Sequence, residues 1–270
     1  MPSTFEVQDI SFSYDAIPAI RGLTLRIEEG DRIALLGANG SGKSTLLRIL
    51  DALYFPSTGS VTFKGDALTQ EHLQDDQFSL NFRRRVALVF QNPDVQLFNP
   101  TVFDEVAYGP LQMGWSKEDV IRRVEETIEF MTISPLRDRP PYRLSGGEKK
   151  RVALASVLVL DPEVLLLDEP TATLDPKSQS QVIDLIQQWK GTAKTVITAT
   201  HQLEIVEDIA DRVLVLEAGR VIAEGTPTEI LSNADLLLRA NLIHAHRHSH
   251  GGAVHSHPHS HGYSHHEHEH

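Results

Sequence analysis

The chain has 270 residues, 40% of them hydrophobic and 23% charged, which is long enough to bury a full core and ordinary for a soluble globular protein. The formal net charge of −12 argues against nonspecific binding to nucleic acid or to anionic lipid, so any contact with a membrane is expected to run through a protein partner. The absence of cysteine excludes disulfides and thiolate metal sites and is compatible with the cytoplasm.

Strands dominate the first part of the sequence. Phe5 to Tyr14 and Leu23 to Ile27 alternate between apolar and polar residues, as half-buried strands do. Glu29 to Asp31 then predicts a hairpin turn, which leads into a buried strand from Ile33 to Leu36. With a further short strand from Ser60 to Phe63, this opening part is expected to be antiparallel in character.

A glycine-rich turn follows the strand that ends at Leu36. Its spacing of glycine, four residues, glycine, lysine and serine is that of a P-loop, in which backbone N–H groups and a helix N-terminus face phosphate oxygens. Lys43 is predicted to reach the β- and γ-phosphates, and the Ser44 hydroxyl to bind Mg²⁺. The alternative is a chance glycine turn before a helix. The predicted nucleotide-binding residues are Gly37, Ala38, Asn39, Gly40, Ser41, Gly42, Lys43, Ser44 and Thr45.

The middle of the chain is expected to be helical. After a compact buried strand from Val86 to Phe90, few β-branched runs occur. Val102 to Tyr108 predicts one helix, and Lys117 to Met131 predicts a stronger one that Ser116 caps. We interpret about residues 92–160 as a small helical subdomain inserted in a sheet domain.

Helices and strands then alternate regularly, which implies a parallel sheet with covering helices. Residues 1–243 are therefore interpreted as one domain, and the low-complexity residues 244–270 as a flexible tail that does not pack. The predicted helices are Glu148–Leu160, Pro176–Trp189 and Leu203–Ile209; the strands are Val164–Leu167 and Lys194–Thr200, followed by a hairpin of Val213–Glu217 with Arg220–Glu224.

Two acids follow the predicted strand that ends at Leu167. A buried strand that ends in Asp168 and Glu169 places both carboxylates at the carboxyl edge of the sheet, beside the P-loop, where ligands bind in such folds. Asp168 is predicted to hold Mg²⁺, and Glu169 to polarise the attacking water as a general base. The alternative is a strand that simply meets solvent in charged residues.

A second glycine turn, Ser145-Gly146-Gly147, precedes the helix predicted from Glu148. Serine and glycines at a helix N-terminus make a second anion site, so one chain has two phosphate-binding turns but only one acidic edge. The simplest explanation for the unequal numbers of turns and acidic edges is that this turn completes the nucleotide site of another subunit. The local alternative is an ordinary capped helix start.

Taken with the P-loop, the sequences LSGGE at 144–148 and LLLDEP at 165–170 and the lone His201 after a strand closely resemble the ATP-binding-cassette (ABC) ATPases. The resemblance covers roughly Thr4 to Asp235, with the motifs in the family's order. It implies ATP and Mg²⁺ as cofactors, ATP hydrolysis as the activity, and pairing with a second ABC ATPase subunit, identical or different. The implied fold is α/β, that of the P-loop ABC ATPases, with a mainly parallel sheet core, an antiparallel β subdomain and the inserted helical subdomain.

The resemblance also implies roles on the nucleotide side. Tyr14 is similar to the aromatic residue that stacks on adenine, Gln91 to the glutamine that contacts Mg²⁺ and the attacking water, and His201 to the histidine that holds the γ-phosphate. The alternatives are an exposed strand residue, a plain strand end and a capping histidine, respectively. With Glu169 as the base, the expected catalytic residues are Glu169, His201 and Gln91, and the expected Mg²⁺ ligands are Ser44, Gln91 and Asp168.

On the side of the partner subunit, Ser145 and Gly147, with Gly146 between them, resemble the donors to the γ-phosphate of the opposite ATPase. Asp175 resembles the residue of the loop that crosses the dimer interface. This chain has Glu148 where many members of that family have glutamine. We expect this difference to adjust the dimer interface while the LSGGE motif keeps its role.

The stretch VFQNPDVQLF at 89–98, with TVFDEVAYGP at 101–110, is similar to the ATPases of energy-coupling-factor importers, which are vitamin and cobalt or nickel systems. In that family this segment carries the groove for coupling helices of integral membrane subunits, which implies a peripheral position on the cytoplasmic face of the cell membrane. Phe98, Phe103 and Tyr108 are candidates for its apolar wall; the alternative is that they belong to the core of the helical subdomain.

Histidine is concentrated at the end of the chain, from His244 to His270, where it recurs at nearly every second residue. Neutral imidazole is a common ligand of divalent transition metals, so the tail predicts weakly selective metal binding, with a purification tag as the alternative. The leading hypothesis is an ATPase that powers nickel or cobalt import. The alternatives are the ATPase of a vitamin importer, a soluble ABC ATPase acting on nucleic acid or ribosomes, which the acidic charge disfavours, and a metal-storage or delivery protein.

Overall fold

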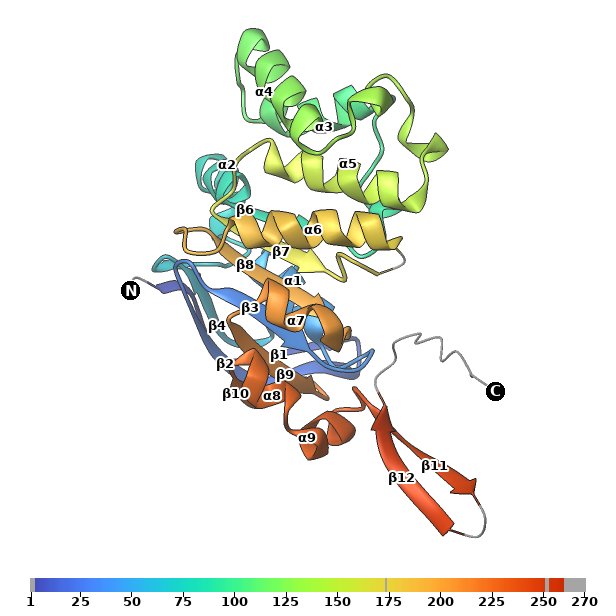
Figure 1. Cartoon of the computed structure of the whole chain (residues 1–270). Coiled ribbons are helices and arrows are strands. Elements are labelled where there is room, and N and C mark those ends of the chain that lie inside the picture. Colours follow the sequence, from blue (N-terminus) through green and yellow to red (C-terminus); the bar gives the residue numbers. More distant parts are fainter. Residues whose placement is uncertain (1–2, 173, 251–252, 260–270) are drawn as a thin grey trace, which may run out of the picture.

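Two sheets organise the computed structural model, which describes residues 3–172, 174–250 and 253–259 and the side chains of 3–172 and 174–243 (Figure 1). An antiparallel four-stranded sheet has the order β2-β1-β4-β5. A six-stranded sheet has the order β10-β9-β3-β8-β7-β6, in which β10 alone runs antiparallel to its neighbour. The strands of the first sheet are β1 (Ser3–Tyr14), β2 (Ile17–Glu28), β4 (Thr58–Phe63) and β5 (Asp66–Ala67). Those of the second are β3 (Arg32–Leu36), β6 (Val86–Val89), β7 (Val164–Asp168), β8 (Thr195–Thr200), β9 (Arg212–Glu217) and β10 (Arg220–Gly225).

The helices form two groups that Figure 1 separates clearly. The inserted helical subdomain contains α3 (Val102–Gln112), α4 (Lys117–Phe130) and α5 (Gly146–Leu158) and lies far from the antiparallel sheet. Ser116 caps α4 as predicted, because its hydroxyl accepts the N–H of Asp119. The remaining helices are α1 (Lys43–Leu50), α2 (Asp76–Arg85), α6 (Pro176–Gln188), α7 (Val206–Ile209), α8 (Pro227–Leu231) and α9 (Ala234–Arg239).

Each central strand feeds two cores, because successive side chains point to opposite faces of the sheet. In β7, Val164 and Leu166 join the core on the side of the antiparallel sheet and α1, whereas Leu165 and Leu167 join the core beneath the helical subdomain. Burial on both faces explains why the strands read as unbroken apolar runs. The predicted fold class, with its parallel sheet, antiparallel subdomain and inserted helices, is confirmed.

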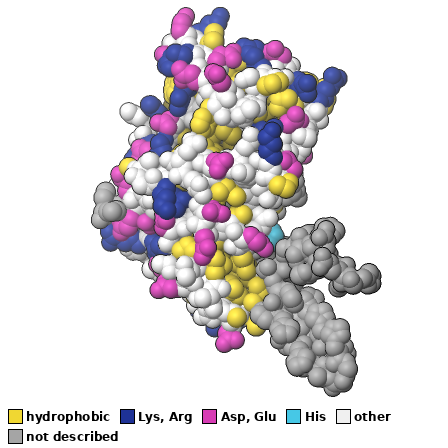
Figure 2. Space-filling view, viewed as in Figure 1, with side chains coloured by type: hydrophobic (Ala, Val, Ile, Leu, Met, Phe, Trp, Pro, Cys, Tyr) yellow, Lys and Arg dark blue, Asp and Glu magenta, His cyan; other side chains and the backbone are white. Residues whose placement is uncertain are grey.

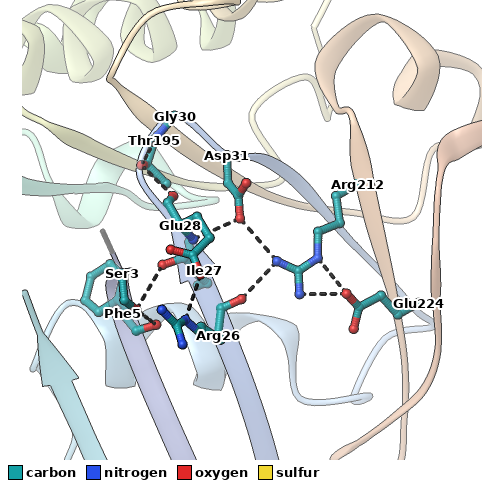
Figure 3. Close-up of polar contacts among 10 residues, drawn as sticks. All are labelled: Ser3, Phe5, Arg26, Ile27, Glu28, Gly30, Asp31, Thr195, Arg212 and Glu224. Atoms are coloured by element: carbon teal, nitrogen blue, oxygen red, sulfur yellow. Dashed lines mark hydrogen bonds and ion pairs between the residues drawn. The ribbon is translucent and has the colours of Figure 1, made fainter. Parts of the chain in front are cut away.

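The predicted hairpin at Glu29 to Asp31 is wrong, because β2 and β3 enter different sheets. Figure 3 shows what holds this turn. Asp31 accepts the N–H of Glu28 and a bond from Arg212 of β9, while Thr195 of β8 donates to the Glu28 carbonyl and accepts the N–H of Gly30. The turn is thus tied to the parallel sheet by long-range polar contacts that local spacing does not reveal.

Two further differences lie near the end of the chain. The helices α8 and α9 were not predicted, although Thr226 and Glu229 form a capping box with Pro227 at the first helical position. Leu242 and Ile243, just beyond α9, are buried in the core. In the tail, the backbone of β11 (His244–His250) pairs antiparallel with β12 (Ala253–His259) where no regular structure was predicted; residues 251–252 and 260–270 lie outside the described part. None of the helices in the described ranges is long and apolar enough to cross a membrane.

A buried acid joins α1 to α2 and gives the fold a testable pH dependence. Asp51 is 6% exposed, and Arg83 donates to its main-chain oxygen at 2.5 Å and to its Oδ2 at 3.2 Å. Burial raises the pKa of Asp51 to about 7, against the opposing effect of Arg83. Since this folded-state pKa exceeds the unfolded value, the folded chain holds the proton more tightly, and the resulting stabilisation is lost as the pH rises towards 7.

We therefore expect Asp51→Asn to flatten the pH dependence of the free energy of unfolding between pH 5 and 7, by up to about 1.4 kcal/mol per pH unit. Urea titrations of both chains at each pH measure this slope. Parallel profiles for parent and variant contradict the assignment. Asp66→Asn, an exposed acid on β5, serves as the control.

Candidate functional site

The P-loop joins β3 to α1 and curls around its own lysine. Gly42 has a φ of 108°, and a Cβ there would lie 2.7 Å from the Ala19 carbonyl oxygen, so only glycine fits without strain. Lys43 is 5% exposed, and its Nζ donates to the carbonyl oxygens of Gly37 at 2.6 Å and Ala38 at 3.3 Å. Burial lowers the pKa of Lys43, opposed by the nearby carboxylates of Glu169 and Asp168.

A cleft of about 460 Å³ opens over this loop. Gly37 and Ala38 lie behind it, where they accept the hydrogen bonds of Lys43. The cleft thus brings together predicted residues from β1, the P-loop and the ends of β6 and β7, in agreement with a single nucleotide site. The residues lining it are Tyr14, Ile17, Pro18, Ala19, Asn39, Gly40, Ser41, Gly42, Lys43, Ser44, Thr45, Gln91 and Glu169.

Tyr14 forms one wall of the cleft. Its ring packs edge-on against Phe12 at 5.1 Å and Tyr54 at 5.7 Å, and its hydroxyl lies 3.1 Å from Thr45 Oγ1. The ring is held in place on three sides while 38% of the residue stays exposed. This arrangement leaves an aromatic surface for a base at the mouth of the cleft.

The acid pair lies at the carboxyl edge of the sheet. Asp168 ends β7 and accepts a hydrogen bond from the Ser44 hydroxyl at 2.9 Å; burial raises its pKa, which that hydrogen bond opposes. Glu169 has a φ of 47°, unusual for a residue other than glycine, and its buried carboxylate lies 4.0 Å from Lys43 Nζ and 2.8 Å from His201 Nδ1. Such a backbone conformation is typical of functional sites, where surrounding contacts maintain it.

The oxygen-rich edge of the cleft suits Mg²⁺. The Ser44 hydroxyl and Asp168 carboxylate are hard oxygen ligands already side by side, and Gln91, at the end of β6, lines the same cleft with an exposed side chain. Within the described ranges there is no cluster of three or more His, Cys, Asp or Glu residues that could hold a softer metal.

The second glycine turn does not line this cleft. Ser145 caps α5, because its hydroxyl accepts the Glu148 N–H at 3.4 Å, while the Glu148 carboxylate accepts the Ser145 N–H at 2.7 Å. That main-chain hydrogen bond is the first cause of the lowered pKa of Glu148. The capped helix start is therefore present, and Ser145, whose hydroxyl also hydrogen-bonds to the Glu148 carboxylate, is exposed.

Asp175 lies next to this turn. A Cβ at Gly147 would meet Ser178 Oγ at 3.1 Å and Asp175 Oδ2 at 3.5 Å, so the absence of a side chain allows α5 to approach the start of α6. Asp175 caps α6 by accepting the N–H and hydroxyl of Ser178, which lower its pKa. Ser145, Gly146, Gly147 and Asp175 thus form a second, separate polar surface on the same chain.

Sequence reasoning missed several residues that support the site. Thr200 donates to Glu169 Oε2 at 3.3 Å, and Arg48 donates to the Tyr14 hydroxyl at 3.4 Å. Lys150 is 2% exposed and donates to the carbonyl oxygens of Phe90 and Gln91. Burial lowers its pKa to about 8. The place of Thr200 beside His201 was a usable signal; Lys150 gave none, because its contacts are 59 and 60 positions away.

Comparisons with known proteins agree with this geometry. Residues 20–172 match the ABC transporter family. The chain is 53% identical to the nickel import ATP-binding protein NikO of Rhodobacter capsulatus, over 90% of this chain and 97% of that protein. The structure of cbiO1 from Clostridium perfringens, part of the ABC transporter complex cbiONQ, matches with a TM-score of 0.74 and 35% identity, over 90% of this chain and 96% of that one. The dimeric ATP-binding cassette MJ0796 bound to ADP and Pi matches with a TM-score of 0.75 and 27% identity, over 83% and 98%.

Proposed function

Because this chain belongs to the ABC transporter family and is an ATP-hydrolysing ATPase of an importer, we propose that it powers the import of nickel or cobalt through a membrane transporter complex. The observation that carries the proposal is the 53% identity, along nearly the whole chain, to a nickel import protein. The cleft supports it, because Lys43, Ser44 and Glu169 line it. Asp168 is hydrogen-bonded to Ser44 and His201 to Glu169, directly behind this lining.

In the proposed mechanism the residues of the chain orient the phosphates and move one proton. Lys43 and the P-loop N–H groups bind the phosphates, and Glu169 takes the proton of the attacking water. His201, bonded through Nδ1 to Glu169, is thereby fixed in orientation. Ser44, Asp168 and Gln91 would hold Mg²⁺, which supplies neutralisation of the phosphate charge.

Each chain would supply half of two ATP sites. The P-loop cleft has no residue of the second glycine turn in its wall, and Ser145 and Gly146 of that turn are exposed while Gly147 is half-buried. In a dimer, Ser145, Gly146 and Gly147 of one subunit would donate to the γ-phosphate held by the other, with Asp175 at the interface. MJ0796 is a dimer of this fold, which supports the arrangement; the second subunit is an identical or a different ATPase.

An exposed aromatic pair would receive the membrane subunit. Phe98 and Tyr108 are 67% and 42% exposed and meet edge to face at 5.0 Å. Phe103, the third candidate, is instead half-buried against the core, with the Arg137 guanidinium 4.2 Å above its ring. We therefore assign Phe98 and Tyr108 to the contact, which would hold the chain at the cytoplasmic face of the cell membrane as a peripheral subunit.

Metal uptake tests the function directly. We expect cells that lack this chain to lose ATP-dependent uptake of radiolabelled nickel or cobalt, and the parent chain to restore it. Lost vitamin uptake with unchanged metal uptake would indicate the vitamin importer. A soluble ATPase acting on nucleic acid would leave both unchanged; the net charge of −12, and the mixed charges over the helical subdomain in Figure 2, do not favour it.

The histidine-rich tail, residues 244–270, is proposed to bind the divalent metal before transport. Since it lies apart from the cleft in sequence, we expect its deletion to leave the ATPase rate within about twofold of the parent while metal-dependent uptake falls at low external metal. The measurement compares uptake across a metal series in the full-length and truncated chains. Equal uptake at every concentration would show that the tail does not serve transport.

A further inference from the structure

Three side chains make the polar contacts that join α5 to the segment that carries Gln91. Lys149 pairs with Asp94 at 2.6 Å on the surface. Gln96 donates to the Ala153 carbonyl at 2.9 Å and to Ser156 Oγ at 3.1 Å, and it accepts the N–H of Phe90 at 3.4 Å. Lys150, between these two contacts, donates to the carbonyl oxygens of Phe90 at 2.9 Å and Gln91 at 3.2 Å.

The lysine contact is the unusual one. Lys150 is 2% exposed, and its ammonium donates only to main-chain oxygens among the described residues; the carboxylates of Asp168 and Glu169 attract it from beyond ion-pair distance. A buried ammonium is costly unless its donors are satisfied, whereas an apolar side chain would fill the same space without that cost. The contact therefore calls for an explanation beyond packing.

The position of Lys150 on α5 supplies one. It lies one helical turn from the Ser145-Gly146-Gly147 turn, and its partner Gln91 lines the nucleotide cleft. A helix is stiff over one turn, so a shift of the Gln91 main chain moves that turn with it. One end of this connection is Gln91, proposed above to help hold Mg²⁺ in the nucleotide site of its own chain. The other end is the glycine turn proposed above to complete the site of the partner subunit.

We propose that Lys150 is a positioning residue that fixes the main chain of Gln91 to α5, so that Gln91 and the second glycine turn move as one unit during ATP hydrolysis. This inference rests on the proposed role of Gln91. Lys150 touches neither nucleotide nor Mg²⁺ in this scheme; it acts through Gln91. Gln96 and Lys149 hold the same segment against α5 on either side.

A double-mutant cycle on ATP hydrolysis tests the inference with the full chain and Mg·ATP. Lys150→Met removes the donors and keeps an unbranched apolar side chain. We expect it to lower kcat about tenfold with the KM for ATP within about twofold, because orientation is lost while the P-loop still binds. Lys150→Arg, which keeps a charged donor, should restore most of the rate.

In a Gln91→Ala background, Lys150→Met should lower kcat less than about twofold further, since the residue it positions is already gone. Leu158→Ala, on α5 two turns away, is the control for lost helix packing. If it lowers the thermal stability of the chain as much as Lys150→Met does, its kcat should still stay near the parent value. If Gln91→Ala does not change kcat, both the role of Gln91 and this inference are overturned. If Gln91→Ala lowers kcat and Lys150→Met multiplies that loss tenfold, only this inference is overturned.

Discussion

Glu169→Gln should reduce the ATPase rate by about a thousandfold or more, while ATP binding and dimer closure persist. A general base typically contributes 10²- to 10⁴-fold, and glutamine has nearly the same shape but cannot take a proton at neutral pH. The structure adds the reason for the size of the effect. Glu169 is buried, bonded to His201 and Thr200 and held at a φ of 47°, so a neighbouring acid cannot take its place.

The measurement is steady-state phosphate release, together with ATP affinity and the size of the ATP-bound protein in solution. Glu224→Gln makes the same chemical change at an exposed ion pair with Arg212 and should leave the rate unchanged. If Glu169→Gln hydrolyses ATP at the parent rate, the assignment of the base is wrong.

Lys43→Ala should abolish both tight ATP binding and metal uptake. The ammonium is desolvated, donates to Gly37 and Ala38 and lies 4.0 Å from Glu169, so its removal takes a buried positive charge from the phosphate-binding turn, beside two carboxylates. Charge-assisted hydrogen bonds to phosphate are strong, and we expect ATP affinity to fall by about a hundredfold or more.

The same variant separates transport from metal storage or delivery. A storage or delivery protein whose main function resides in residues 244–270 would continue to supply metal after Lys43→Ala, because that tail is untouched. Lys64→Ala, which removes a surface lysine paired with Glu29 and Glu163, is the matched control and should leave ATP affinity and uptake unchanged. Undiminished metal delivery by the Lys43→Ala variant would contradict the proposal that this chain powers metal import.

Local motifs located residues that the structure brings together at and beside the P-loop cleft. A P-loop is a contiguous turn, and the two acids follow a buried strand directly. The spacing of residues along the chain is therefore enough to predict their chemical roles. The capping serines, such as Ser116, were equally readable, because a cap and the N–H it accepts are three residues apart. What the site residues do remains a prediction until the variants are measured.

Long-range pairing was not readable in this way. The alternation in β2 shows which side chains face inward, and the apolar run of β3 shows burial on both faces. Neither pattern shows which strand lies alongside, and so the hairpin predicted at Glu29–Asp31 is wrong. The starts of α8 and α9 are local signals that the sequence contains although neither helix was predicted: a capping box of Thr226 with Glu229 precedes α8, and Asn233 caps α9.

The sequence by itself determined the fold class, the phosphate-binding turn and the acids, because each depends on residues close together in the chain. The sequence also placed Asp168 beside the P-loop, and the structure gives the contact, a hydrogen bond from Ser44 across 124 positions. Only the tertiary structure joined His201 to Glu169 across 32 positions and Lys150 to Gln91. The physical reason is that periodicity records burial, whereas a contact between distant residues depends on the order of strands in the sheet, which no local pattern contains.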